Sequence, residues 1–177
     1  MGGSWLYGHN EDNSARYILG EPGKRMLACF GINPSTATPE ALDPTLKQVK
    51  RRAAMHGYDG WIMFNVYPQR ATDPNDLHAE VDEAIHAENL AVIKDFFGNY
   101  SCDIWAAWGT LISKRSYLFD CLRDIVKVVR PRSSALTTSK WVHIGKLSKE
   151  LHPHHPLYLS HKESPAEFDI ERYLGMT

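Results

Sequence analysis

Three polar side chains, those of Asn33, Ser35 and Thr36, directly follow the apolar run 26–32. Pro34 can neither donate to a strand ladder nor leave Asn33 free to adopt helical angles, so the chain must turn there and present the three side chains together. In open α/β sheets, ligands bind at the carboxyl ends of the strands. The sequence therefore indicates where a site would lie more clearly than which chemistry it would perform.

Three further apolar runs lead into polar or irregular segments. The run 60–66 contains Asn65 near its end, the run 103–108 stops before a glycine, and the run 141–145 precedes the histidine-rich segment 151–160. If the runs are parallel strands of one sheet, their carboxyl ends share one rim. We therefore expect the polar residues that follow them to lie close together.

The segments between these runs have helical patterns. Asp43-Pro44 is typical of a helix N-cap followed by proline at the first helical position, and apolar residues then recur at helical spacing as far as Gly57. Similar patterns predict helices over 77–97 and 110–129, and the capping box Ser164–Glu167 predicts a last helix.

Alternating strands and helices predict an α/β fold, a three-layer α/β/α sandwich around a mostly parallel four-stranded central sheet. With 177 residues and 43% hydrophobic side chains, we expect one domain over 1–177. Residues 1–24 are expected to form an N-terminal extension that is a hairpin or an edge strand.

Composition excludes several protein classes. No apolar run reaches the roughly 20 residues of a membrane span, and the N-terminus lacks the pattern of a signal peptide, so we expect a cytoplasmic protein without a membrane partner. The net charge of −1 provides no global basic field for nucleic acid. The three cysteines have no C-x-x-C spacing, which favours reduced, packed thiols.

Cofactor and metal sites are not predicted. The glycine-rich motifs of dinucleotide-binding folds and P-loop NTPases do not occur. Neighbouring histidines on an extended chain alternate faces, and no Cys or Glu completes a ligand set with His152, His154 and His155.

Three short motifs resemble the uracil-DNA glycosylase superfamily. They are Gly31-Ile-Asn-Pro-Ser35, Asn65-Val-Tyr-Pro-Gln-Arg70 with Asp73-Pro74, and His155-Pro-Leu-Tyr-Leu-Ser160. Over its first two thirds, the chain also resembles the domain-of-unknown-function family 1643 (DUF1643), through Asn33–Ala37, Asp43–Thr45, Asn65 and Ala71–Pro74. The second resemblance implies no activity.

The glycosylase resemblance implies roles for individual residues. Asn33 would hold or polarise water near a sugar C1′, Asn65 would read the edge of a base, and His155 would donate a hydrogen bond to the departing base. Leu157 and Leu159 would form an apolar wedge. With Asn33 and His155 as catalytic residues, the full substrate-binding set is Ser35, Thr36, Asn65, Tyr67, Arg70, Asp73, Trp108, Leu157, Leu159 and Ser160.

Structural alternatives exist for most of these residues. Asn33 and Asn65 could bond only to backbone, Asp43 and Asp73 could be helix or turn caps, and Trp108 could lie in the core instead of stacking on a base. Arg70 could pair with Asp73 or bind an anion.

Departures from the glycosylase pattern limit the chemistry. Asn33 stands where the most efficient branch has Asp, and an amide cannot take a proton from water. Ser35 leaves the pocket floor open, where a bulky aromatic would exclude a substituted pyrimidine, and Tyr158 occupies a place that a small residue or proline usually holds.

The leading hypothesis is a protein that binds a nucleobase, a nucleotide, or single-stranded or flipped nucleic acid, with cleavage of the N-glycosidic bond as an added activity. One alternative is a non-catalytic module that recognises a modified base or nucleotide. Another is a hydrolase or transferase of a small phosphorylated or carboxylated metabolite, acting through Arg70, Ser35, Thr36 and an Asp.

Overall fold

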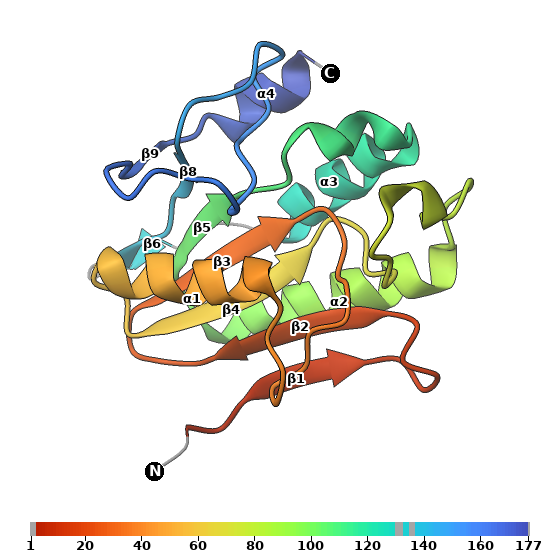
Figure 1. Cartoon of the computed structure of the whole chain (residues 1–177), viewed down its shortest axis with the longest axis horizontal. Coiled ribbons are helices and arrows are strands. Elements are labelled where there is room, and N and C mark those ends of the chain that lie inside the picture. Colours follow the sequence, from red (N-terminus) through yellow and green to blue (C-terminus); the bar gives the residue numbers. More distant parts are fainter. Residues whose placement is uncertain (1–2, 130–132, 135–136, 177) are drawn as a thin grey trace.

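Seven strands form one sheet in the computed structural model, which describes residues 3–129, 133–134 and 137–176 (Figure 1). The order of the strands across the sheet is β1-β2-β4-β3-β5-β8-β9. Their bounds are β1 Leu6–His9, β2 Arg16–Glu21, β3 Met26–Gly31, β4 Gly60–Asn65, β5 Asp103–Ala106, β8 Trp141–Ile144 and β9 Pro165–Glu167. A separate ladder pairs β6 (Ser133–Ser134) with β7 (Thr137–Thr138).

The four strands that the apolar runs predicted are the parallel centre of this sheet. β3 pairs with β4 on one side and with β5 on the other, and β5 pairs with β8, in each case in parallel. β3 and β4 are buried along their whole length, because helices cover both faces, and this accounts for their almost unbroken apolar sequences.

The sheet is larger than the four strands expected. The N-terminal segment is a hairpin, β1–β2, and it pairs with β4 antiparallel, so the extension is part of the sheet. On the other edge β9 pairs with β8 antiparallel, through residues 165–167. The expectation of a helix beginning at the capping box 164–167 was therefore wrong: these residues form a ladder with β8, and the helix begins after Asp169.

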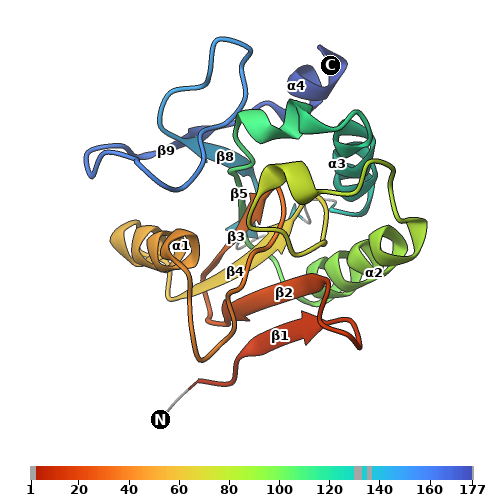
Figure 2. The same cartoon turned by 45° about the vertical axis from the view of Figure 1, so that its right-hand side comes forward.

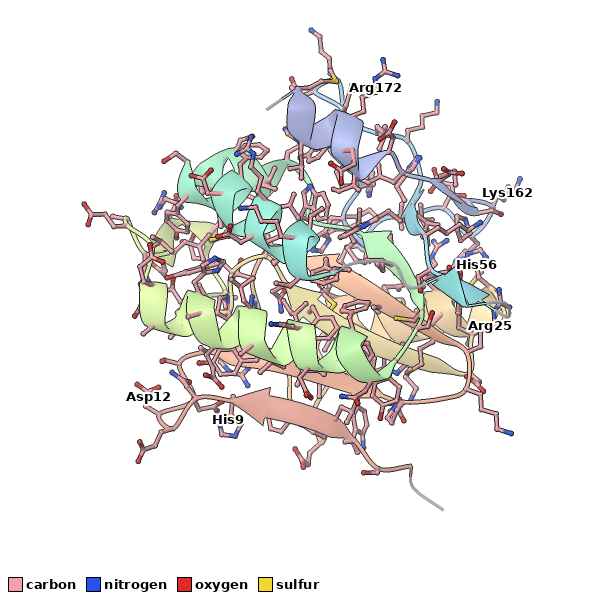
Figure 3. All side chains as sticks on the ribbon, turned by 180° about the vertical axis from the view of Figure 1, so that it is seen from behind. His9, Asp12, Arg25, His56, Lys162 and Arg172 are labelled. Atoms are coloured by element: carbon pink, nitrogen blue, oxygen red, sulfur yellow. The ribbon has the colours of Figure 1, made fainter. Side chains whose placement is uncertain are left out.

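Helices lie on both faces of the sheet. Helix α1 (Pro44–Met55) packs on one face, and α2 (Glu83–Asn99) and α3 (Tyr117–Val128) pack on the other, as Figure 2 shows. From behind, α2 and α3 lie in front of the sheet (Figure 3). The α/β class is thus confirmed. The short C-terminal helix α4 (Ile170–Gly175) packs on the same core as α3.

Aspartate N-caps determine where α1 and α2 begin, which the apolar periodicity of the sequence located only approximately. Asp43 caps α1 by accepting from the Leu46 N–H at 2.9 Å, as expected. The helix expected over 77–97 begins only after Asp82, which caps it, and a 3₁₀ turn η1 (Pro74–Asp76) lies upstream. The helix expected over 110–129 is divided into the 3₁₀ helix η2 (Thr110–Lys114) and α3.

All three thiols are packed in the core. Cys29, Cys102 and Cys121 are free and buried, and burial raises the pKa of each, to about 12 for Cys102 and Cys121. None of the helices in the described ranges is both long and apolar enough to cross a membrane.

Candidate functional site

A small cavity of about 60 Å³ lies at the carboxyl ends of β3 and β4. It is lined by parts of the chain that are distant in sequence: Arg16, Gly31, Ile32, Asn33, Pro34, Ser35, Asp43, Thr45, Leu46, Met63, Asn65 and His155. The cavity therefore brings together the first residue of β2, the loop after β3, the N-terminus of α1, the end of β4 and the histidine-rich segment.

Asn65 is the most unusual side chain of the cavity. It ends β4, where it pairs with Gly31, and only 1% of its surface is exposed. Neither its Oδ1 nor its Nδ2 has a hydrogen-bond partner among the described residues. A buried polar group without a partner costs about 1–3 kcal/mol, so an amide with two such atoms is expected to have a use.

The neighbouring helix fixes the main chain of Asn65. Asn89 of α2 is completely buried and donates from Nδ2 to the Asn65 carbonyl at 3.0 Å. Because this bond uses only the backbone oxygen of Asn65, the side-chain amide remains free to meet a ligand.

Asn33 braces the loop that follows β3. Its Nδ2 donates to three carbonyls, those of Pro34 at 3.0 Å, Gln69 at 3.4 Å and Ala71 at 2.8 Å. The alternative that Asn33 bonds only to backbone therefore holds for its side-chain nitrogen. Its Oδ1 has no hydrogen bond with the described residues, so any contact with a ligand would use Asn33 as an acceptor.

His155 lies on a segment fastened to the end of β5. Gly109 follows β5 with a φ of 66°, a conformation that favours glycine, and its N–H donates to the Pro153 carbonyl at 3.0 Å. The Leu157 N–H donates to Nδ1 of His155 at 3.2 Å, so the neutral ring carries its proton on Nε2.

Burial, followed by the nearby His154, lowers the pKa of His155, and Asp43 opposes this effect. At neutral pH the imidazole is therefore a neutral donor. Without first losing a proton, such a ring can donate a hydrogen bond to an oxygen that gains negative charge.

We call residues 151–164 the histidine strap. Arg52 of α1, which is 1% exposed, holds the strap against the helix. Its Nη2 donates hydrogen bonds to the carbonyls of Leu159 at 2.7 Å and Ser160 at 2.8 Å. The strap belongs to the blue segment that connects β8 to β9 in Figure 1. Helix α1 thus positions both Asp43 and, through the strap, His155.

Two charged residues of the cavity, Arg16 and Asp43, were not included in the site inferred from sequence. Asp43 had been interpreted as a helix cap, which it is, but it also lines the cavity. Arg16 starts β2 and is 1% exposed, with Nε and Nη2 unpartnered. Burial and the nearby Arg70 lower the pKa of Arg16 to about 10, so it remains charged at neutral pH. No motif marked it.

Arg70 and the hydroxyl residues border an adjoining groove of about 310 Å³, lined by Asn13, Ser35, Thr36, Arg70, Ala71 and Thr72. Arg70 donates to the carbonyls of Ser35 at 2.6 Å and Ala37 at 3.2 Å, and to the Tyr7 hydroxyl at 2.9 Å. It has no bond to Asp73, so the expected alternative of an Arg70–Asp73 pair was wrong. Ser35 lines both the groove and the cavity.

Three residues assigned to the site lie elsewhere. Trp108 is completely buried and donates from Nε1 to the Tyr173 hydroxyl at 3.1 Å, which makes it a core residue. Tyr67 is also completely buried, with its hydroxyl between His78 and the Asp82 N–H. Asp73 is exposed and caps η1. Core packing explains the positions of Trp108 and Tyr67, and capping explains that of Asp73, in each case without a ligand.

The tip of the histidine strap differs from the expected apolar wedge. Leu159 is half-buried against the core on the α1 side, and Leu157 is also only partly exposed. The Ser160 main chain bonds with Arg52 and Glu163. The side chain that projects is Tyr158, which is 95% exposed with a φ of 66°.

The histidines of the strap segment 151–160 have separate partners. His155 accepts from the Leu157 N–H, as described above. His152 bonds with the Tyr173 hydroxyl at 2.8 Å, whereas His154 bonds with the carbonyl of His155 at 2.6 Å. Within the described ranges, no group of three or more His, Cys, Asp or Glu side chains could hold a metal ion.

Comparison with known proteins connects this cavity to one family. The sequence model of DUF1643, described as a protein of unknown function, matches residues 16–157. The match begins at Arg16 and ends two residues after His155, so it contains every residue that lines the cavity. No curated protein and no solved structure matches the chain.

Proposed function

The chain belongs to the DUF1643 family, and we propose that it binds a nucleobase-containing ligand in the cavity of Asn33, Asn65 and His155. The observation that carries this proposal is the amide of Asn65, which is buried and has neither a donor nor an acceptor for its two polar atoms. A heterocyclic base presents adjacent donors and acceptors on its edge, and a carboxamide can pair with two of them at once.

The size of the cavity agrees with this kind of ligand. A space of about 60 Å³ accommodates a few water-sized groups, which suits the edge of one planar ring better than a large substrate. Isolated rings enter such pockets only when they are free or unstacked. The three glycosylase-like motifs support the same ligand class, since each of them contributes a residue to the cavity or its border.

The polar groups also favour hydrolysis of an N-glycosidic bond. In this reaction water adds to C1′ of the sugar, and the C1′–N bond breaks with its electron pair passing to the base. The proton of the water passes to the Asp43 carboxylate, while Nε2–H of His155 holds the base oxygen that gains negative charge. The proton then leaves Asp43 for solvent, and the base anion takes one from solvent.

Asp43 supplies what Asn33 cannot. A carboxylate accepts a proton from water and a carboxamide does not. One oxygen of Asp43 accepts from the Leu46 N–H, and the other has no hydrogen bond with a described residue. Asn33 would orient the water through its free Oδ1.

A binding experiment tests the first part of the proposal. Thermal unfolding of the full chain is followed with free bases, nucleosides, nucleoside monophosphates and single-stranded oligonucleotides that contain uracil, hypoxanthine or alkylated bases. A ligand that binds only the folded state raises the melting temperature. Nucleobase-containing compounds should do so for the wild type and not for Asn65→Ala; stabilisation by phosphosugars or carboxylic acids alone would instead favour the small anionic metabolite.

A product assay tests the second part. The stabilising compounds are incubated with the protein, and released base or abasic sites are measured. Asp43→Asn, which retains an oxygen to cap α1, should abolish release and retain binding. Binding without release by the wild type would leave the non-catalytic module as the function.

A further inference from the structure

Two arginines, the buried Arg16 and the partly buried Arg70, meet beside the cavity. Nη1 of Arg16 and Nη1 of Arg70 donate to the same carbonyl, that of Ala37, at 3.3 and 3.2 Å. Arg16 retains two unpartnered nitrogens, Nε and Nη2, and Arg70 retains Nε. Bringing two like charges together in a buried position is costly unless a negative charge compensates them.

The protein supplies little of that negative charge. None of the ion pairs between described residues includes Arg16 or Arg70. Asp43 is near enough to favour the charged form of Arg16, but it does not form an ion pair with it, and its own charge is shared with the N-terminus of α1. That N-terminus adds a partial positive charge of its own. The local balance is therefore positive.

We propose that this arginine pair is the binding site for a terminal phosphate group, and that the ligand is a free mononucleotide. This inference rests on the proposed function for the base, and it adds the chemical class of the rest of the ligand. The phosphate lies where cavity and groove meet at Ser35, within reach of the planar Nε–Nη2 edge of Arg16, which suits two parallel bonds to oxygen. The base lies against Asn65.

Burial favours a free nucleotide over a strand of nucleic acid. Arg16 is only 1% exposed, so it can meet a terminal phosphate where the cavity joins the groove, but not easily an internal phosphodiester, which has chain on both sides. The net charge of −1 also means that the chain as a whole has no basic field of the kind that attracts a polyanion.

Calorimetric titration of the full chain distinguishes the possibilities. The probes are the four common ribonucleosides, their 5′-monophosphates, inorganic phosphate and a single-stranded octanucleotide of each base. The best monophosphate should bind about tenfold or more tightly than its nucleoside, since charge-assisted hydrogen bonds contribute about 1.5–3 kcal/mol. It should also bind more tightly than the octanucleotide and than inorganic phosphate.

A matched pair of variants locates the effect. Arg16→Gln should remove the preference for the monophosphate over the nucleoside, so that the two bind with about the same affinity. Arg51→Gln, a change of the same charge at an exposed position of α1, should alter neither. If Arg16→Gln fails to fold, the comparison of nucleoside with monophosphate on the wild type still decides the matter.

Failure of the phosphate site and failure of the base site would give different results. Equal affinity for nucleoside and monophosphate would overturn the phosphate site and leave the base site standing. Inorganic phosphate that binds as tightly as any nucleotide, with no nucleoside binding, would support the anion site and overturn the proposed base recognition. Tighter binding of the octanucleotide would overturn the assignment to a free mononucleotide.

Discussion

Asn89 of α2 holds the main-chain carbonyl of Asn65 at 3.0 Å, while the side chain of Asn65 bonds to nothing in the described structure. Two buried asparagines in contact thus differ in kind. One fastens a helix to the end of a strand, and the other points its hydrogen-bonding groups at a cavity. Oδ1 of Asn89 also lacks a partner among the described residues, but its Nδ2 satisfies the Asn65 carbonyl, whereas neither side-chain atom of Asn65 bonds to anything. The difference can be measured, because removing the Asn89 amide breaks a buried hydrogen bond and removing the Asn65 amide does not.

We expect Asn65→Leu to stabilise the ligand-free protein. Leucine shares the γ-branched shape of asparagine, and the adjoining cavity can take its larger methyl groups. Because the change also removes two buried polar atoms without partners, the free energy of unfolding should rise by about 1 kcal/mol. Stabilisation by nucleobase compounds should disappear in the same variant. Denaturant unfolding, with and without ligand, measures both effects.

The matched control is Asn89→Leu. This change leaves the Asn65 carbonyl without its donor in a buried position, so the free energy of unfolding should fall by about 1–3 kcal/mol. If the two variants changed stability in the same direction, the distinction between a structural and a ligand-binding asparagine would be lost.

Gly31→Ala should obstruct the cavity. A Cβ at Gly31 would lie 2.6 Å from Cε of Met63 and 3.1 Å from Oδ1 of Asn65, so the flexible Met63 side chain must move and the amide must shift. We expect ligand affinity to fall at least tenfold with a stability loss of about 1–3 kcal/mol, typical of an overpacked core. Gly98→Ala, where a Cβ meets nothing within 4 Å, is the control and should retain full affinity.

Arg52→Met should loosen the histidine strap. The change removes the donors to the Leu159 and Ser160 carbonyls but retains much of the apolar side chain, and we expect a loss of about 1–3 kcal/mol. Hydrogen exchange should become faster for amides of residues 151–164. Arg51→Met, at an exposed position, should stay within about 0.5 kcal/mol of the wild type and leave strap exchange unchanged.

Acid should destabilise the protein through His152, which is buried, and His155, which is partly buried. Burial is the main cause that lowers the pKa values of His152 and His155 below the ordinary 6.5. The unfolded chain therefore binds more protons than the folded one as pH falls below about 6.5, and stability decreases there until the lowered folded pKa values are passed.

Melting temperatures between pH 8 and pH 5 test this expectation. His155→Gln should show a shallower decline than the wild type, whereas His161→Gln, at an exposed position, should follow the wild-type curve. Ligand binding should weaken over the same range, because a protonated His155 places a second N–H against the Leu157 amide. A pH-independent affinity would contradict the role of the neutral imidazole.

Much of the fold could be predicted because the signals were local. The central strands are covered on both faces and are therefore almost continuously apolar, and the Asp43-Pro44 pair marks a helix start by its own chemistry. The positions of Asn33 and His155 followed from the same reasoning, since parallel strands must end on one rim. The capping-box pattern at 164–167 failed because pairing with β8 outweighed a local preference.

The sequence by itself determined the α/β class, the central strands, and the polar residues at their ends. Only the tertiary structure revealed that Arg16 completes the cavity, that Trp108 and Tyr67 belong to the core, and that Asn65 has no partner. The physical reason is that burial and hydrogen-bond satisfaction depend on what other segments bring to the same place. A residue type shows what a side chain can donate or accept, but only its packed neighbours show whether that capacity remains available for a ligand.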